Sequence, residues 1–455
     1  MRLTFEEGTL LLRDFAEGDP VPPAFVWDAR VDMWRAQAHF YRDSLDFLRR
    51  EGGCDNKAPR YRRFDLPQRQ APDPHPHQRE ALQGWRQNRS RGVVVLPTGS
   101  GKSQVGLAAI AATGRSALVV APTIDLMNQW YDLLTHAFET EIGLLGGGYH
   151  ELQDITASTY DSAYMHMERY GDRFGLIVFD EVHHLPGEMY SHAAEMALAP
   201  YRLGLTATPE RADGRHVLLD SLVGPVVYQK GIRDLSGEYL AEYRVERRQV
   251  QMVAEERATY ETAREEYQAF LSDKNIKMGS LKGWQRFVQL SASSNAGRRA
   301  MLAYRQHRKI ALGTQSKLRV LEDILKAHPR DRVLVFTNDN ETVYRIARTF
   351  LIPAITHQTR TKERRQLLQD FNAGDHLALV TSKVLNEGVN IPEANVAVIL
   401  SGSATIREHV QRLGRILRRR AGKEAVLYEV ISSDTVEDRI SQRRRRHEAY
   451  ADGGE

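Results

Sequence analysis

A glycine-rich stretch with a lysine and a serine stands in VVVLPTGSGKSQVGLAAI, residues 93–110. The order predicts a strand, a tight loop and the start of a helix. Backbone N–H groups of such a loop surround phosphates, Lys102 adds a charge for the β- and γ-phosphates, and the Ser103 hydroxyl suits Mg²⁺. Leu96 stands where the usual pattern has its first glycine, but the context still favours a phosphate site. The predicted site comprises Pro97, Thr98, Gly99, Ser100, Gly101, Lys102 and Ser103.

A second candidate element is GLIVFDEVHH, residues 175–184, an apolar run that ends in two acids. Asp180, at the strand end, is suited to hold Mg²⁺ through water, and Glu181 to polarise an attacking water. The alternative is a pair of surface acids after a strand. A phosphate loop in the same chain favours the catalytic interpretation, so we expect a nucleotide triphosphatase that uses ATP and Mg²⁺.

These motifs lie within short β-rich apolar runs that alternate with helical patterns, which is typical of buried parallel strands. We therefore expect an α/β fold with two open sheets. The first set of predicted strands is 93–96, 117–122, 175–180 and 201–206, and the second is 332–337, 377–382, 396–401 and 425–430.

The segments outside the two sets divide the chain further. Residues 31–50 have a helical pattern after a strand-like start, and prolines between Pro67 and Pro76 mark a boundary. Between about 230 and 312 the pattern is charged and helical, without strands. The expected parts are an N-terminal α+β module (1–71), a first α/β domain (72–229), a helical insert (230–312), a second α/β domain (313–440) and a basic tail (441–455).

Composition limits the class of protein. The chain has 455 residues, one cysteine and a net charge of +4, which excludes an intrachain disulfide and favours a polyanionic partner. No run is long enough for a membrane span, so we expect a cytoplasmic protein. RYRRF, residues 60–64, interleaves arginines with aromatic residues. That pattern suits phosphate contact with base stacking and suits an ordinary amphipathic edge equally well.

The order of four motifs resembles that of superfamily 2 helicases of the DExH type, and most closely the XPB family in its short archaeal and bacterial form. The motifs are DEVH, GLTATPERADGR (204–215), VTSKVLNEGVNIPEA (380–394) and QRLGRILRR (411–419). The resemblance implies two RecA-like domains, a thumb-like insert and an N-terminal damage-recognition-like module. It also implies 3′→5′ DNA translocation, a role in nucleotide excision repair, single-stranded and forked duplex DNA as partners, a nuclease partner in many prokaryotes, and association with the nucleoid.

The resemblance also assigns roles to residues. Gln411 is expected near the attacking water, and Arg415 and Arg418, which share a helix face, as arginine fingers. Gln78 would recognise adenine, with Gly388 and Asn390 completing the ATP site. The residues expected to couple ATP to DNA are His183, Thr206 and Thr208, and those expected to contact DNA are Gln129, Thr159, Arg211, Asp213 and Thr381.

Some positions depart from the family pattern. His77 replaces a frequent tyrosine before Gln78, Ala212 replaces the acid of an Arg-Glu-Asp element, and Asn386 and Asn390 replace aspartates. Two alternative functions remain open at this point: an RNA helicase on the same core, and a nucleotide-dependent scaffold that recruits a nuclease without unwinding. A restriction-enzyme motor would need a nuclease or methylase region, and the sequence shows no such constellation.

Overall fold

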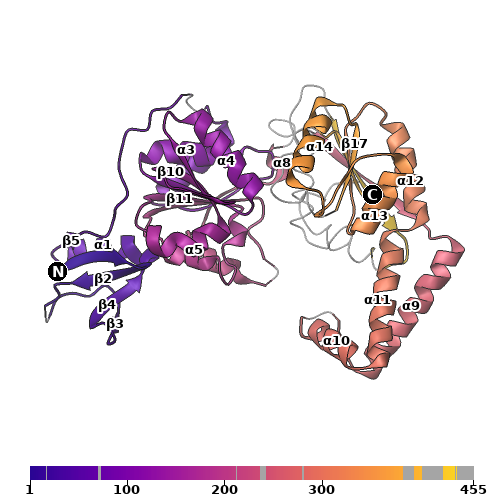
Figure 1. The fold of residues 1–455 in the computed structure, drawn as a ribbon, viewed down its shortest axis with the longest axis horizontal. Coiled ribbons are helices and arrows are strands. Elements are labelled where there is room, and N and C mark those ends of the chain that lie inside the picture. The colour runs from indigo at the N-terminus through magenta and orange to yellow at the C-terminus, as the bar shows by residue number, and fades with distance from the viewer. Residues whose placement is uncertain are drawn as a thin grey trace. The chain divides into compact units, whose positions relative to one another are not determined.

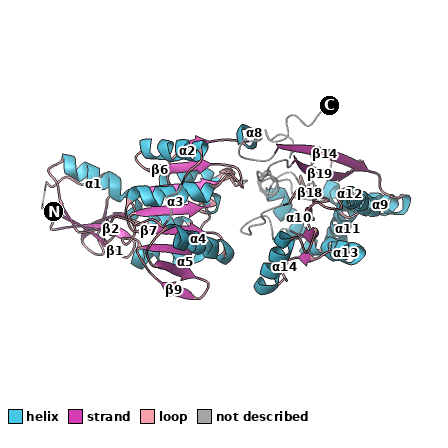
Figure 2. Ribbon diagram, turned by 90° about the horizontal axis from the view of Figure 1, so that it is seen from above, coloured by secondary structure: helices cyan, strands magenta, loops and turns pink. Residues whose placement is uncertain are grey.

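The computed structural model divides the chain into two compact units, Met1–Asp234 and Leu235–Glu455 (Figure 1). It describes residues 1–16, 18–69, 73–211, 213–235, 242–278, 281–382, 394–401, 424–435 and 437. Each unit contains its own parallel sheet with helices packed against it (Figure 2). The expected α/β class is therefore confirmed. None of the helices in these described ranges combines the length and apolarity that crossing a membrane requires.

The first unit begins with a small α+β module. Its sheet has the order β3-β4-β2-β1-β5 and is antiparallel except where β1 meets β5. Its elements are β1 (Arg2–Glu6), β2 (Thr9–Arg13), β3 (Val26–Asp28), β4 (Met33–Gln37), the 3-10 turn η1 (Ala38–Phe40), α1 (Tyr41–Arg50) and β5 (Asp55–Asn56). The helix expected over 31–50 therefore begins only at Tyr41. The preceding residues pair with β2, with Trp34 opposite Leu12, and this sheet pairing overrides the helical pattern.

The larger sheet of the first unit has the order β13-β6-β12-β11-β7-β10-β8-β9. All its strand pairs are parallel except β8 with β9. The strands are β6 (Arg91–Val95), β7 (Ala117–Ala121), β8 (Ile142–Gly146), β9 (Tyr149–Glu151), β10 (Ile155–Thr159), β11 (Leu176–Asp180), β12 (Tyr201–Thr206) and β13 (Val226–Gln229). Its helices are α2 (Pro76–Gln87), α3 (Lys102–Thr113), α4 (Ile124–Ala137), α5 (Tyr160–Tyr170), α6 (Ser191–Glu195), α7 (Leu219–Leu222) and α8 (Ile232–Leu235), with 3-10 turns η2 (Val182–His184) and η3 (Arg215–Leu218). The four strands expected here are confirmed.

The second unit contains a parallel sheet of order β14-β19-β18-β15-β17-β16. Its strands are β14 (Glu242–Val250), β15 (Val333–Phe336), β16 (Ala354–Ile355), β17 (Ala378–Thr381), β18 (Val396–Ile399) and β19 (Glu424–Ser432). Its helices are α9 (Ala254–Asp273), α10 (Leu281–Ser293), α11 (Asn295–Leu312), α12 (Gln315–Ala327), α13 (Asn340–Phe350) and α14 (Thr361–Ala373). Helices α9 to α11 form the expected helical projection, with Tyr267, Phe270 and Phe287 in its core (Figure 1).

The expectation that residues 230–312 contain no strand is wrong. β14 lies in this range and pairs in parallel with β19 along its whole length. Its sequence EYRVERRQV carries charges at most positions. Because β14 is the first strand in the sheet order, it lies at an edge and lacks the continuous apolar run that marks a buried strand.

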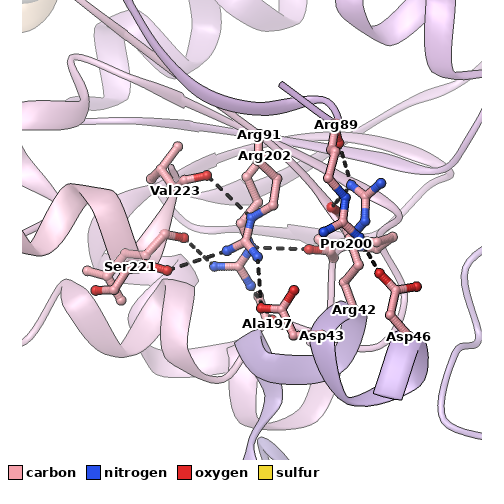
Figure 3. Close-up of polar contacts among 12 residues, drawn as sticks. Arg42, Asp43, Asp46, Arg89, Arg91, Ala197, Pro200, Arg202, Ser221 and Val223 are labelled. Carbon is pink, nitrogen blue, oxygen red and sulfur yellow. Dashed lines mark hydrogen bonds and ion pairs between the residues drawn. The ribbon is translucent and has the colours of Figure 1, made fainter. Parts of the chain in front are cut away.

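Charged side chains hold the N-terminal module against the first large sheet (Figure 3). Arg42 of α1 donates to the carbonyl oxygens of Arg89 and Pro200, and Asp46 of α1 forms an ion pair with Arg89. Asp43 lies 4.0 Å from Arg91 at the start of β6. The apolar core of the module also includes Leu198, from the loop before β12, so module and sheet share one packed interface.

The linker after this module runs along the same sheet. Arg60 forms an ion pair with the buried Asp172, the Arg62 N–H donates to Ser116 Oγ at 3.0 Å, and the Phe64 N–H donates to the Gly114 carbonyl at 3.1 Å. These contacts favour the amphipathic-edge interpretation of RYRRF, since Arg60 is already engaged within the chain.

A buried ion pair joins three parts of the second unit. Lys317 of α12 donates to Glu437 Oε2 at 2.5 Å and to the Leu400 carbonyl after β18. Glu437 Oε2 also accepts a hydrogen bond of 2.9 Å from the Ser432 N–H at the end of β19. Both charged side chains are only 2% exposed. Each charge therefore depends on the other for its stability in this environment.

We predict that Lys317→Met destabilises the second unit by about 3–5 kcal/mol, because it leaves a buried carboxylate without its cation. Lys317→Met combined with Glu437→Gln should recover more than half of that loss, since the amide oxygen still accepts from Ser432. Chemical denaturation followed by fluorescence measures both. The control is Lys326→Met, which removes the exposed pair with Glu322 on the same helix and should change stability little. Equal effects of Lys317→Met and Lys326→Met would contradict the prediction.

Candidate active site

The predicted phosphate loop joins β6 to α3, as the sequence indicates. Gly99 and Gly101 have φ of +87° and +82°, a region that favours glycine. A Cβ atom on Gly101 would lie 2.3 Å from Gln78 Nε2. Lys102 opens α3 and is buried, and its Nζ donates to the Leu96 carbonyl at 3.3 Å. The ammonium group thus lies within the loop, where an anion would meet it.

Two residues of α2 brace this loop. Gln78 Nε2 donates to the Ser100 carbonyl at 2.9 Å, and His77 Nε2 lies 2.9 Å from the same oxygen. Gln78 Oε1 accepts from the His75 N–H. Burial lowers the pKa of His77, which favours a neutral ring. His77 therefore acts as a support of the loop, and adenine recognition by Gln78 stays a prediction.

The carboxylate of Asp180 lies at the carboxyl end of β11 and is held by two donors. Trp130 Nε1 of α4 donates to Oδ2 at 2.8 Å, and the Glu181 N–H donates to Oδ1 at 3.0 Å. Burial, followed by the charge of Glu181, raises the pKa of Asp180 to about 6, while the Trp130 hydrogen bond and the Lys102 charge act in the opposite direction. Because β6, which precedes the phosphate loop, and β11, which ends at Asp180, both pair in parallel with β12, the loop and the acidic motif lie at the same edge of the sheet.

Glu181 follows in a left-handed conformation with φ of +45°. This conformation is costly for a residue with a side chain, and such strain concentrates at functional sites. Its Oε2 atom is buried and lacks a hydrogen-bond partner among the described residues, although it lies 3.4 Å from His183 Nδ1. An acceptor in this state is suited to a water molecule or a metal-bound water.

The three predicted coupling residues meet in one hydrogen-bonded group. His183 Nδ1 lies 3.0 Å from Thr206 Oγ1, and that hydroxyl donates to the Thr208 carbonyl at 3.0 Å. The Thr208 N–H donates back to Thr206 Oγ1 at 3.2 Å. The group connects the turn after Glu181 to the end of β12, and a role in coupling stays a prediction.

The predicted DNA-contacting residues differ in their accessibility. Arg211 forms a two-point ion pair with Asp213 and donates to the His183 carbonyl at 2.7 Å. The Arg211 guanidinium holds the pKa of Asp213 well below its usual range. Thr159 is buried as the N-cap of α5, where its hydroxyl accepts from the Ser162 N–H. Thr381 is buried at the end of β17, and Gln129 is half-buried on α4. A role in binding DNA stays a prediction for each.

The remaining predicted site residues lie outside the described residues. They are Gly388, Asn390, Gln411, Arg415 and Arg418, together with the departures Ala212 and Asn386.

The sequence did not reveal two further contacts of the acidic motif. Trp130 donates to the Asp180 carboxylate, and the Tyr160 hydroxyl donates to the Asp180 carbonyl at 3.0 Å. Both residues are aromatic and lie in helices, so in the sequence they resemble ordinary core residues. The signal in the sequence was Gly106, a glycine inside the helix α3. In the structure, a Cβ atom on Gly106 would approach Trp130 Cη2 to 2.7 Å.

Three family models match the chain. They are the type III restriction enzyme res subunit over residues 71–211, the helicase conserved C-terminal domain over 316–420, and the xeroderma pigmentosum group B helicase damage recognition domain over 3–53. Among solved structures, the Hef helicase domain of Pyrococcus furiosus matches with a TM-score of 0.56 and 16% identity, covering 81% of this chain and 97% of that one. The RNA-bound Dbp5 of Saccharomyces cerevisiae matches with a TM-score of 0.56 and 14% identity, covering 84% of this chain and 88% of that one. These structures support the RecA-like helicase fold alone.

Comparison with individual related proteins identifies the family more specifically than the solved structures do. The chain is 40% identical to DNA 3′-5′ translocase XPB2 of Sulfurisphaera tokodaii over 94% of its own length and 97% of the relative's. It is 33% identical to DNA 3′-5′ helicase XPB of Mycobacterium tuberculosis over 78% of its length, but spans only 60% of that relative. The chain belongs to the XPB family of superfamily 2 helicases, whose members use ATP.

Proposed function

We propose that the chain is an ATP-dependent DNA helicase or translocase with 3′→5′ polarity that opens DNA during nucleotide excision repair. The observation that carries the ATPase part is the buried Asp180 carboxylate at the carboxyl end of β11, at the same edge of the parallel sheet as the phosphate loop that follows β6. The DNA part is carried by membership of the XPB family. Both observations are needed, because many kinds of motor protein share this ATP site, and only membership of the XPB family indicates DNA as the substrate.

Mg²⁺ fits this site. A buried carboxylate whose pKa is raised by burial and by a neighbouring acid is stabilised in its charged form by a cation. Asp180 and Ser103 would hold the ion, Asp180 through a water molecule, and the ion would neutralise charge on the phosphates. The buried Oε2 of Glu181, without a hydrogen-bond partner in the described part of the chain, supports an assignment to orienting the attacking water.

Other parts of the chain have proposed roles that follow from the family. Gln411 lies near the attacking water, Arg415 and Arg418 stabilise the transferring phosphoryl group as arginine fingers, and Gly388 and Asn390 bind the nucleotide with Gln78. His183, Thr206 and Thr208 couple hydrolysis to Gln129, Thr159, Arg211, Asp213 and Thr381 on the DNA path. The domain ranges 1–71, 72–229, 230–312, 313–440 and 441–455 are also proposed, with β14 of the range 230–312 belonging to the sheet of the second unit. A nuclease partner and action at the nucleoid are proposed on the same basis.

DNA should stimulate ATP hydrolysis. We expect single-stranded and forked DNA to raise the steady-state rate of wild-type protein at least about tenfold, because motor ATPases gain their closed state from nucleic-acid binding. RNA of the same sequence should have little effect. Glu181→Gln provides the blank, and raising the salt from 50 to 300 mM should weaken DNA binding strongly. Equal rates with and without DNA would favour the scaffold, and preferential stimulation by RNA would overturn the choice of substrate.

A second prediction concerns pH. The folded protein holds the Asp180 proton more tightly than the unfolded chain, so stability falls as pH rises from the ordinary value of 3.8 towards about 6. Asp180→Asn cannot ionise. Its stability relative to wild type should therefore increase across this window, by at most about 1.4 kcal/mol per pH unit. Thermal unfolding in EDTA measures the difference.

The same unfolding series with Mg²⁺ and ADP provides the control. A bound cation stabilises the charged form of Asp180. The change with pH in the stability difference between wild type and Asp180→Asn should therefore become smaller. Parallel stability curves for the two proteins between pH 4 and 6.5 in EDTA would contradict the assignment.

A further inference from the structure

Trp130 differs from an ordinary buried tryptophan in what its indole touches. The side chain is 1% exposed, and its Nε1 donates to Asp180 Oδ2 at 2.8 Å. Trp85 of α2 is also buried, and its Nε1 donates over the same 2.8 Å, but to the backbone carbonyl of Arg202. A strand carbonyl is fixed by its own backbone. A carboxylate side chain is not, so its orientation depends on its donors.

The indole also reaches the phosphate-loop helix. A Cβ atom on Gly106 of α3 would lie 2.7 Å from Trp130 Cη2 and 3.4 Å from Leu205 Cδ1. Only glycine leaves room for the ring at this point. One side chain therefore connects α4, from which it comes, to α3 and to the end of β11.

Both oxygens of Asp180 are held by donors whose positions depend on different elements. The Glu181 N–H belongs to the strand end itself, while Trp130 belongs to α4. A displacement of α4 therefore acts on one oxygen and leaves the other bond in place. Such a displacement would rotate the carboxylate and change how it could hold a water molecule of a metal ion.

We propose that Trp130 is a positioning residue that links α4 to the metal-binding carboxylate, so that DNA bound along α4 sets the orientation of Asp180 and accelerates hydrolysis. This inference rests on the proposed DNA-dependent ATPase and names the side chain through which DNA acts. Gln129 immediately precedes Trp130 in α4, so a force on the DNA path reaches the indole through adjacent backbone.

The test compares Trp130→Phe with the matched control Trp85→Phe. Each variant loses one buried indole hydrogen bond of equal length, and circular dichroism and the thermal midpoint establish that each is folded. Two quantities are measured. One is the ratio of ATPase rates with and without single-stranded DNA. The other is the ratio of ADP dissociation constants in EDTA and in Mg²⁺ by calorimetry, which isolates the metal's contribution and needs no turnover.

We expect Trp130→Phe to reduce both ratios, the second by about tenfold, as for loss of one hydrogen bond to a charged group. Trp85→Phe should keep both near wild type. If Trp130→Phe does not fold, Gly106→Ala serves instead, because the added Cβ displaces the indole tip while alanine favours the helix.

The remaining outcomes overturn the inference in distinguishable ways. Unchanged ratios in folded Trp130→Phe, or equal losses in both tryptophan variants, assign Trp130 to packing alone. A lower ratio of the ADP dissociation constants in EDTA and in Mg²⁺, with normal stimulation of the ATPase by DNA, would show that Trp130 positions Asp180 but does not connect it to DNA bound along α4. Wild-type protein that DNA does not stimulate overturns the proposed function itself.

Discussion

The first unit is organised around one buried carboxylate. Asp180 is 7% exposed and lies beside a second acid, and an isolated charge in such a place is costly. The surrounding elements offset that cost: α4 supplies an indole N–H, the strand end supplies a backbone N–H, and α3 supplies the charge of Lys102. A bound Mg²⁺ would remove most of what remains. The site therefore favours the binding of a cation.

The N-terminal module belongs to the same unit and shares its packing. Arg42, Asp43 and Asp46 of α1 contact the starts of β6 and β12 or the loops beside them, which is the end of the sheet opposite the phosphate loop. Arg202 is fully buried there and donates to three backbone carbonyls, so α1 brings carboxylates to a cluster of arginines. The module is therefore held against the sheet by both charged and apolar contacts.

The local sequence was sufficient to predict elements that are buried and whose functional residues are adjacent in the chain. The phosphate loop and eight parallel strands, the DEVH strand among them, follow from apolar runs with fixed flanking residues. The local sequence was insufficient where tertiary contacts determine the secondary structure or the partner of a side chain. β14 is charged because it lies at a sheet edge, residues 33–37 form a strand because β2 is available to pair, and the contact of His77 with the Ser100 carbonyl joins residues 23 apart in sequence. The Trp130–Asp180 contact joins residues 50 apart in sequence, and no spacing rule reports it.

The most direct test of a DNA motor is the direction of its movement. Streptavidin bound to biotin at either end of a single-stranded oligonucleotide is displaced by a translocase that arrives at that end. We expect ATP-dependent displacement from the 5′ end, little from the 3′ end, and none with Lys102→Ala. Displacement from the 3′ end would contradict the polarity. No displacement from either end, in a protein whose ATPase responds to DNA, would contradict translocation.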